Sequence, residues 1–185
     1  MNTGLIILAA GNSVRFGGQK LLHRIGDRKM YEYALDTALR TGFDTAVVTQ
    51  YNEIAEAASK RGFTAIINCF PERGISYSVR LGTEHFKNKD ALIFAVCDQP
   101  YLKPETIQRL ADEFERSQLT IARLTDGTHP GNPVIFDKRY IKELLSLSGD
   151  TGGKAVIKAH PDEVLYILAN SIELTDIDTN NDIKN

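Results

Sequence analysis

The chain has 185 residues, of which 42% are hydrophobic and 25% charged, with 14 glycines and 6 prolines. This composition is close to that of globular proteins and excludes collagen-like, coiled-coil and intrinsically disordered chains. The length predicts a single domain, 1–185, with its own hydrophobic core. The 22 basic and 24 acidic side chains provide no basic field for a nucleic-acid backbone, so we expect no nucleic-acid partner.

The two cysteines, Cys69 and Cys97, form no C-x-x-C pair of the kind that binds zinc or carries redox chemistry. Such sparse cysteine usage is typical of a reducing compartment. The first residues lack the basic region of a signal peptide, and no apolar run approaches the ~18 residues of a membrane span. We therefore expect a cytoplasmic protein that has no membrane partner.

In the first half of the chain, short apolar runs alternate with stretches of helical spacing. The run 5–10 is rich in branched residues and predicts a strand that is buried on both faces. A polar, glycine-rich stretch follows, and helical spacing over 30–39 then ends at Gly42, a typical helix C-cap. The next predicted elements are a strand at 45–49, a helix at 53–60 and a strand at 64–67.

The second half continues the same pattern. A helical stretch over 75–86 precedes the run 91–96, which is the most apolar of the chain and predicts a central strand. Pro104 suits the first turn of a helix that continues over 106–114. Two further strands are predicted at 119–123 and 133–136, and the alternation goes on through 138–147, 154–160, 164–168 and from 180 onward.

This alternation predicts an α/β fold of the Rossmann type, with a doubly wound, mostly parallel sheet and helices on both faces. The sequence contains no repeat, low-complexity tract or linker. The segment 125–147 is the best candidate for an insertion into the single domain.

In open α/β sheets ligands bind beyond the carboxyl ends of the strands, and the first predicted strand ends in a glycine-rich loop. Residues 11–20 combine three glycines with the cations Arg15 and Lys20, an arrangement that can bind phosphate. The loop is neither a Walker loop nor a G-x-G-x-x-G fingerprint, which removes the main support for kinases, ATPases and dehydrogenases. An ordinary strand-to-helix loop with solvated charges is the alternative.

The central strand ends in a carboxylate, Asp98, directly beyond the apolar run. A charge in that position needs a partner. Mg²⁺ takes one or two carboxylates together with substrate phosphates, which suits an aspartate that faces a cationic loop. Asp98 could instead cap the following helix or pair with a lysine or arginine.

A second aspartate occurs near the end of the chain, in 176–182, whose first residues resemble the start of an EF-hand loop. Asn181 replaces the turn glycine and the last ligand is missing, so we reject calcium binding. Thr179 and Asp182 fit a helix capping box. Asp178 remains available as a second metal ligand.

Other chemistry has little support. The four histidines form no H-E-x-x-H motif or other close pair, so the sequence does not support a zinc hydrolase. Ser76 and Ser78 lie in a segment without the last glycine of a nucleophile elbow, so they are better explained as hydrogen-bonding or helix-start residues. Two further glycine-containing loops, 129–133 and 149–154, could face the same cleft.

Six segments, in the same order, are similar to the motifs of the molybdenum cofactor cytidylyltransferases. The cytidylyltransferases and the related guanylyltransferases belong to one larger family of NTP transferases. Residues 8–22 resemble its L-A-A-G-x-S-x-R-F-G-x-x-K-L-L signature, 74–82 its G-x-S-x-S-x-x-x-G segment, and 97–100 its metal-binding D-x-P. Residues 131–136 resemble its G-x-P-x-x-F loop, 149–154 its G-D-x-G-A-R loop, and 176–179 its closing D-I-D-T.

The chain departs from this pattern at the side where the acceptor substrate would bind. Asn132 stands where many members have histidine, Tyr77 where serine is frequent, and residues 153–154 where alanine and arginine are common. These differences bear on the identity of the acceptor more than on the chemistry.

The resemblance implies a fold like that of the nucleotide-diphospho-sugar transferases and transfer of CMP from CTP to the terminal phosphate of molybdenum cofactor, with release of pyrophosphate. It implies Mg²⁺, with Mn²⁺ as a substitute, held by Asp98 and Asp178, and a catalytic role for Arg15, Lys20 and Asp98. It also implies a molybdenum hydroxylase as the recipient of the product. The nucleotide-binding residues would be Leu8, Ala9, Ala10, Gly11, Ser13, Arg15, Lys20, Ser76 and Ser78, and the acceptor-binding residues Gln99, Gly131, Asn132, Pro133, Asp150 and Gly152.

Ala10 stands where the guanylyltransferases tend to have glycine, and this resemblance favours CTP. One alternative keeps the reaction and changes the acceptor to a sugar, polyol or isoprenoid phosphate. Another is a non-catalytic module that binds nucleotide and delivers a cofactor. The segment 125–147 would form the acceptor side of the site.

Overall fold

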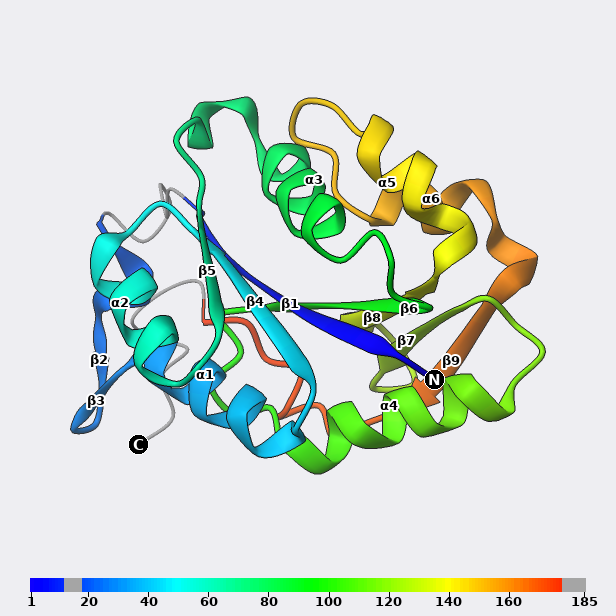
Figure 1. Cartoon of the computed structure of the whole chain (residues 1–185). Helices are drawn as coiled ribbons and strands as arrows, with labels where there is room; N and C mark the ends of the chain where they lie inside the picture. Colours follow the sequence, from blue (N-terminus) through cyan, green and yellow to red (C-terminus); the bar gives the residue numbers. More distant parts are fainter. Residues whose placement is uncertain (12–17, 178–185) are drawn as a thin grey trace.

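The protein folds around a seven-stranded sheet with helices on both faces (Figure 1). The computed structural model describes residues 1–11 and 18–177. Six strands run parallel, and β8 runs antiparallel to both of its neighbours. In spatial order the strands are β5 (Thr64–Ile67), β4 (Asp44–Thr49), β1 (Thr3–Ala9), β6 (Ala91–Val96), β8 (Pro130–Asp137), β7 (Ile121–Thr125) and β9 (Val164–Leu168).

Two apolar layers join the helices to the sheet. One face carries α1 (Met30–Thr41), α2 (Asn52–Lys60) and α4 (Pro104–Arg116), and the other carries α3 (Ile75–His85), α5 (Ile141–Ser146) and α6 (Lys154–Ala159) (Figure 1). Within 1–11 and 18–177, none of the helices is long and apolar enough to cross a membrane. Short elements complete the fold: η2 (Lys20–Leu22), the hairpin β2 (Arg24–Ile25) and β3 (Arg28–Lys29), η3 (Pro71–Arg73), η4 (Lys138–Tyr140) and η5 (Pro161–Glu163).

The predicted fold class is confirmed. The strands predicted at 64–67 and 91–96 coincide with β5 and β6, and the segment 164–168, for which the sequence predicted only that the alternation continues, forms β9. Both layers bury the side chains of β1, where Leu5, Ile6 and Ile7 are at most 1% exposed, which explains its unbroken apolar run. Gly42 ends α1 in the left-handed conformation, as predicted.

The hairpin of β7 and β8 differs from the prediction in its bounds. β8 already begins at Pro130 and includes Pro133, although prolines usually interrupt a strand. The pairing of β7 with β8 is irregular between Arg123 and Thr125, and this bulge accommodates the proline-containing stretch. The segment 125–147 is thus the place where the parallel order is interrupted, and β8 within it is an integral strand of the sheet.

The strand order reverses between β1 and β6. From β1 the chain builds the sheet through β4 to β5, and it then returns to the other side of β1 with β6. Just beyond the end of β6, the amide of Cys97 donates to the carbonyl oxygen of Leu8 in β1, at 3.2 Å. Ligands of open α/β sheets bind in the crevice at such a switch point. The topology therefore places the loop after β1 and the carboxylate after β6 at one crevice.

Candidate active site

The ion pair of Lys20 and Asp98 lies at this switch point. The ammonium nitrogen of Lys20, in η2, is 2.7 Å from Oδ2 of Asp98. Only 10% of the lysine side chain and 24% of the aspartate side chain are exposed. Each charge therefore compensates the other where water is partly excluded. The predicted cation of the glycine-rich loop and the predicted metal ligand are in direct contact. This is the pairing with a lysine that the sequence left open for Asp98, and its role as a metal ligand stays a prediction.

Three consecutive side chains at the end of β4 hold the backbone that follows β1. Thr49 donates its hydroxyl to the carbonyl oxygen of Ala9, Gln50 its amide to that of Ala10, and Tyr51 its hydroxyl to that of Gly11, each at 2.9 Å. These bonds fix one edge of the crevice. The sequence analysis did not identify Thr49, Gln50 or Tyr51, although the parallel neighbour of β1 was the place to look for them.

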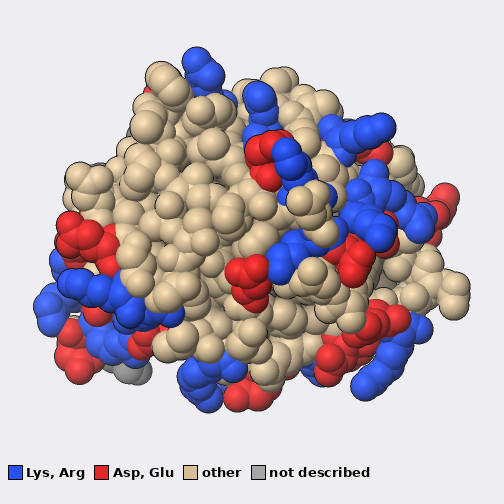
Figure 2. Space-filling model, viewed as in Figure 1, with Lys and Arg blue, Asp and Glu red and all other residues tan. Residues whose placement is uncertain are grey.

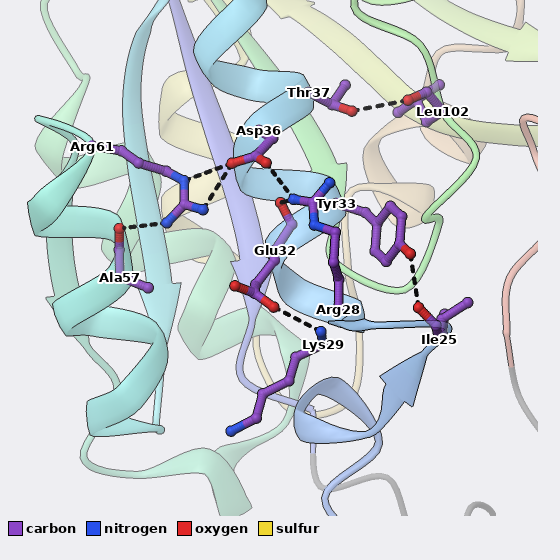
Figure 3. A network of polar contacts seen from close by, with 10 residues as sticks. All are labelled: Ile25, Arg28, Lys29, Glu32, Tyr33, Asp36, Thr37, Ala57, Arg61 and Leu102. Carbon is purple, nitrogen blue, oxygen red and sulfur yellow. Dashed lines mark hydrogen bonds and ion pairs between the residues drawn. The ribbon is translucent and has the colours of Figure 1, made fainter.

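A polar network anchors the hairpin that follows Lys20 (Figure 3). Asp36 on α1 accepts from Arg28 of the hairpin and, at 2.8 Å, from Nε of Arg61 beyond α2. The hydroxyl of Tyr33 donates to the carbonyl oxygen of Ile25 at 2.7 Å. The hairpin is thus bound to α1 and, through Asp36, to the end of α2. This anchoring restricts where η2 can present its lysine.

The two serines predicted to read the base lie at the start of α3 and are buried. Ser76 is 3% and Ser78 4% exposed. The hydroxyl of Ser78 accepts a hydrogen bond from the side-chain amide of Asn68, at 2.9 Å, which ties α3 to the end of β5. A contact of these hydroxyls with a nucleotide stays a prediction.

Close backbone contact explains the glycines of the segment 74–82. Gly74 has a φ of +80°, and a Cβ there would lie 2.5 Å from the carbonyl oxygen of Gly149. That oxygen also accepts from the amide of Ser76 at 3.3 Å. A Cβ on Gly82 would lie 2.5 Å from Cγ2 of Ile6, so the glycine lets α3 approach β1 closely. Two of the predicted motifs, 74–82 and 149–154, therefore meet in the structure.

Gln99 anchors the end of the chain from a buried position. Its side-chain nitrogen donates to Oδ1 of Asp176 at 2.9 Å and to the carbonyl oxygen of Leu174 at 3.3 Å. The residue is 3% exposed, and its contact with the acceptor stays a prediction. The amide of Ile177 donates to the carbonyl oxygen of Asp98 at 3.0 Å. The last described residues therefore lie beside the metal-ligand candidate.

The remaining predicted residues are distributed around the crevice or lie outside the described part. Gly131, Asn132 and Pro133 belong to the bulged part of β8, and the loop that contains Gly152 packs on Ile75 of α3, with Asp150 exposed. Ser13, Arg15 and Asp178 lie outside the described residues, as does the helix predicted from 180 onward.

The described residues fit a divalent cation that is shared with substrate. Within 1–11 and 18–177, no three His, Cys, Asp or Glu side chains converge on one point. A single carboxylate is nevertheless enough when substrate phosphates supply the other ligands, as is usual for Mg²⁺. Asp98, beside an ammonium group that also attracts phosphate, meets this requirement.

Three comparisons with known proteins agree on the kind of domain. The family model "MobA-like NTP transferase domain" matches residues 5–164. Bifunctional protein GlmU of Clostridioides difficile is 28% identical over 147 residues, which cover 75% of this chain and 32% of that protein. The chain thus spans about a third of the length of this relative.

Two other relatives carry names that describe different activities. The probable molybdenum cofactor guanylyltransferase of Thermococcus gammatolerans is 31% identical over 120 residues, 62% of this chain and 58% of that protein. Nicotine blue oxidoreductase of Paenarthrobacter nicotinovorans is 24% identical over 188 residues, 96% of this chain and 90% of that protein.

Solved structures share the whole fold. Rv0371c of Mycobacterium tuberculosis superposes with a TM-score of 0.81 at 25% identity, over 98% of this chain and 95% of that one. A nucleotidyl transferase from Methanothermobacter superposes with a TM-score of 0.82 at 22% identity, over 97% of this chain and 93% of that one.

Proposed function

Because the chain belongs to the MobA-like NTP transferase family, we propose that it transfers CMP from CTP to the terminal phosphate of molybdenum cofactor and releases pyrophosphate. The observation that carries this proposal is the contact of Lys20 with Asp98 at the switch point, beside the backbone of 8–11. A cation and a metal-ligand candidate in one crevice are what transfer between phosphates requires.

In this mechanism an oxygen of the acceptor phosphate attacks the α-phosphorus of the nucleotide. The bond from that phosphorus to the oxygen bridging to the β-phosphate breaks, and pyrophosphate leaves with the electron pair. The ammonium group of Lys20 stabilises the negative charge that develops on the leaving group, together with Arg15. The backbone of 8–11, held by Thr49, Gln50 and Tyr51, positions the nucleotide.

A divalent cation, Mg²⁺ or Mn²⁺, would neutralise phosphate charge when bound, and Asp98 and Asp178 are the residues proposed to hold it. A structure of Rv0371c, which shares the fold at a TM-score of 0.77 and 22% identity, is described as a complex with manganese. This description supports a divalent cation in a protein of the same fold.

The choice of CTP rests on Ala10. The acceptor is assigned to the side formed by Gln99, Gly131, Asn132, Pro133, Asp150 and Gly152. Ser76 and Ser78 are proposed to orient the base through the start of α3. A molybdenum hydroxylase would receive the product, and the reaction would take place in the cytoplasm. The name of the Thermococcus relative supports the acceptor.

Pyrophosphate release tests the proposal. The purified protein is incubated with Mg²⁺, molybdenum-loaded pterin and, in turn, CTP, GTP, ATP or UTP. We expect release with CTP and a loss of about 100-fold or more in Asp98→Asn. Asp112→Asn, at an exposed position of α4, is the matched control and should retain wild-type rates.

Each outcome decides one part of the proposal. Preference for another nucleotide would keep the transfer reaction and overturn the choice of CTP. Wild-type rates in Asp98→Asn would overturn the assigned site. Absence of release with every nucleotide would overturn the reaction with this acceptor.

A redox reaction is the second candidate, because the relative that aligns over 96% of this chain is called an oxidoreductase. The chain has no G-x-G-x-x-G fingerprint for a dinucleotide. Consumption of NADH or NADPH in the presence of nicotine blue, without pyrophosphate release from any nucleotide, would favour this candidate.

A further inference from the structure

One part of the sheet is left uncovered by the helices. On the face that carries α3, α5 and α6, the neighbours Ile121, Phe136 and Val164 are buried. Further along β9 on the same face, Tyr166 is 54% and Leu168 66% exposed. The face is therefore open toward the carboxyl ends of β7 and β9, the end of the sheet at which ligands bind.

Arg123 of β7 belongs to this open area. It pairs in register with Val134 of β8 on one side and with Tyr166 of β9 on the other. Its Nη2 donates to the carbonyl oxygen of Gly131 at 3.2 Å, so the guanidinium reaches the loop assigned to the acceptor. Its Nε is buried and, among the described residues, has no hydrogen-bond partner.

The charge of Arg123 is uncompensated in the part of the chain that the structure describes. None of the ion pairs between described residues includes it. Burial lowers the pKa of its guanidinium, which nevertheless stays protonated at any physiological pH because an arginine begins so high. A half-buried cation of this kind is stabilised by an anion that enters from solution.

We propose that Arg123 binds a negatively charged group of the acceptor other than the phosphate that reacts, while Tyr166 and Leu168 contact its ring system. This inference rests on the proposed function and narrows the acceptor to a phosphorylated, ring-containing compound with a second anionic group. An arginine suits the task because its planar fork can donate two parallel hydrogen bonds to one carboxylate or phosphate.

The distance between Arg123 and Asp98 indicates that Arg123 contacts a part of the acceptor other than the reacting phosphate. Arg123 lies two strands away from β6 and at the level of Phe94, four residues before Asp98. With strand spacings of about 4.8 Å and a rise of about 3.3 Å per residue, the α-carbons of Arg123 and Asp98 are on the order of 15 Å apart. At this separation the two residues face different parts of a bound acceptor, so Arg123 is assigned to its distal part.

Direct binding of two small probes tests the inference without turnover. Pterin-6-carboxylate carries a ring and a carboxylate, and 6-hydroxymethylpterin carries the same ring without the charge. We expect the wild type to bind the carboxylate about 10- to 100-fold more tightly in calorimetric titrations. Arg123→Gln should abolish this preference, Arg123→Lys should retain part of it, and Arg40→Gln, an exposed arginine of α1, should leave it unchanged.

Equal binding of the two probes by the wild type, or binding of neither, would overturn the inference, as would an unchanged preference in Arg123→Gln. If that variant does not fold, Arg123→Lys decides, because loss of the fork should still reduce the preference several-fold and an unchanged preference contradicts the assignment. The pyrophosphate assay is scored separately. Release by a wild type without charge preference would refute the role of Arg123 alone, and charge preference without release would refute the proposed reaction alone.

Discussion

Lys20 and Asp98 are 78 positions apart in the sequence and meet at 2.7 Å. Both are mostly shielded from water, so each is held by the charge of the other. Removing one partner of such a pair leaves an uncompensated charge, which is costlier than removing both. At this site, the proposed function and the stability of the fold therefore depend on the same contact.

Lys20→Gln should lower the rate of pyrophosphate release by about 100-fold or more, since it removes a charge that stabilises the leaving group. It should also lower the free energy of unfolding by roughly 2–4 kcal/mol, measured in urea. In the double variant Lys20→Gln/Asp98→Asn the loss of stability should be smaller than the sum of the single losses. Lys60→Gln, at an exposed position of α2, serves as the control; strictly additive losses would contradict this account.

At the scale of elements, the start of α3 and the loop before α6 are in backbone contact. Gly74 and Gly149 both have positive φ, but only Gly74 faces another backbone at short range. The contact positions the buried serines of α3 and the loop that carries Asp150. These two glycines form a matched pair for separating steric from conformational effects.

Gly74→Ala should destabilise the protein by more than about 3 kcal/mol, because strained backbone and a clash with the carbonyl oxygen of Gly149 add together. Gly149→Ala should cost only about 1 kcal/mol, since a Cβ there meets no atom within 4 Å. Thermal or urea unfolding measures both. Equal losses in the two variants would show that the clash is relieved by a small shift.

At the scale of the whole molecule, the charged side chains and the two cysteines can be compared by their exposure. Figure 2 shows that basic and acidic side chains are interspersed on the displayed face, with a broad uncharged area between the charged margins. The two thiols differ in their exposure to solvent. Cys69, after β5, is exposed, whereas Cys97, after the central strand β6, is 1% exposed. Burial also raises the pKa of the Cys97 thiol, which disfavours the reactive thiolate.

The native protein should therefore react rapidly with one equivalent of iodoacetamide and, in denaturant, with two. Reaction of the second thiol should follow global unfolding, since Cys97 is buried in the apolar layer between the sheet and the helices α1, α2 and α4. Mass spectrometry of partially labelled protein identifies the positions, and Cys69→Ser should remove the rapid phase. Rapid labelling of Cys97 in native protein would contradict the burial described here.

The alternation of apolar runs with helical spacing was enough to determine the fold class, because strands buried on both faces and helices buried on one leave different periodicities. β5 and β6 were predicted to the residue for this reason. The sequence also identified Lys20 and Asp98 as candidates, since glycine-rich loops and strand-terminal carboxylates have a recognisable composition.

Only the tertiary structure decided which of these residues meet. The support that Thr49, Gln50 and Tyr51 give to 9–11 depends on β4 lying beside β1, and strand order is not written in local periodicity. The motif assigned Gln99 to the acceptor, and only the structure reveals its burial and its hydrogen bond to Asp176. Arg123 has no motif at all, and its unpaired charge becomes visible only when neighbouring strands fix what can reach it. Composition and periodicity report burial, whereas contacts between distant residues follow from the order and register of the strands.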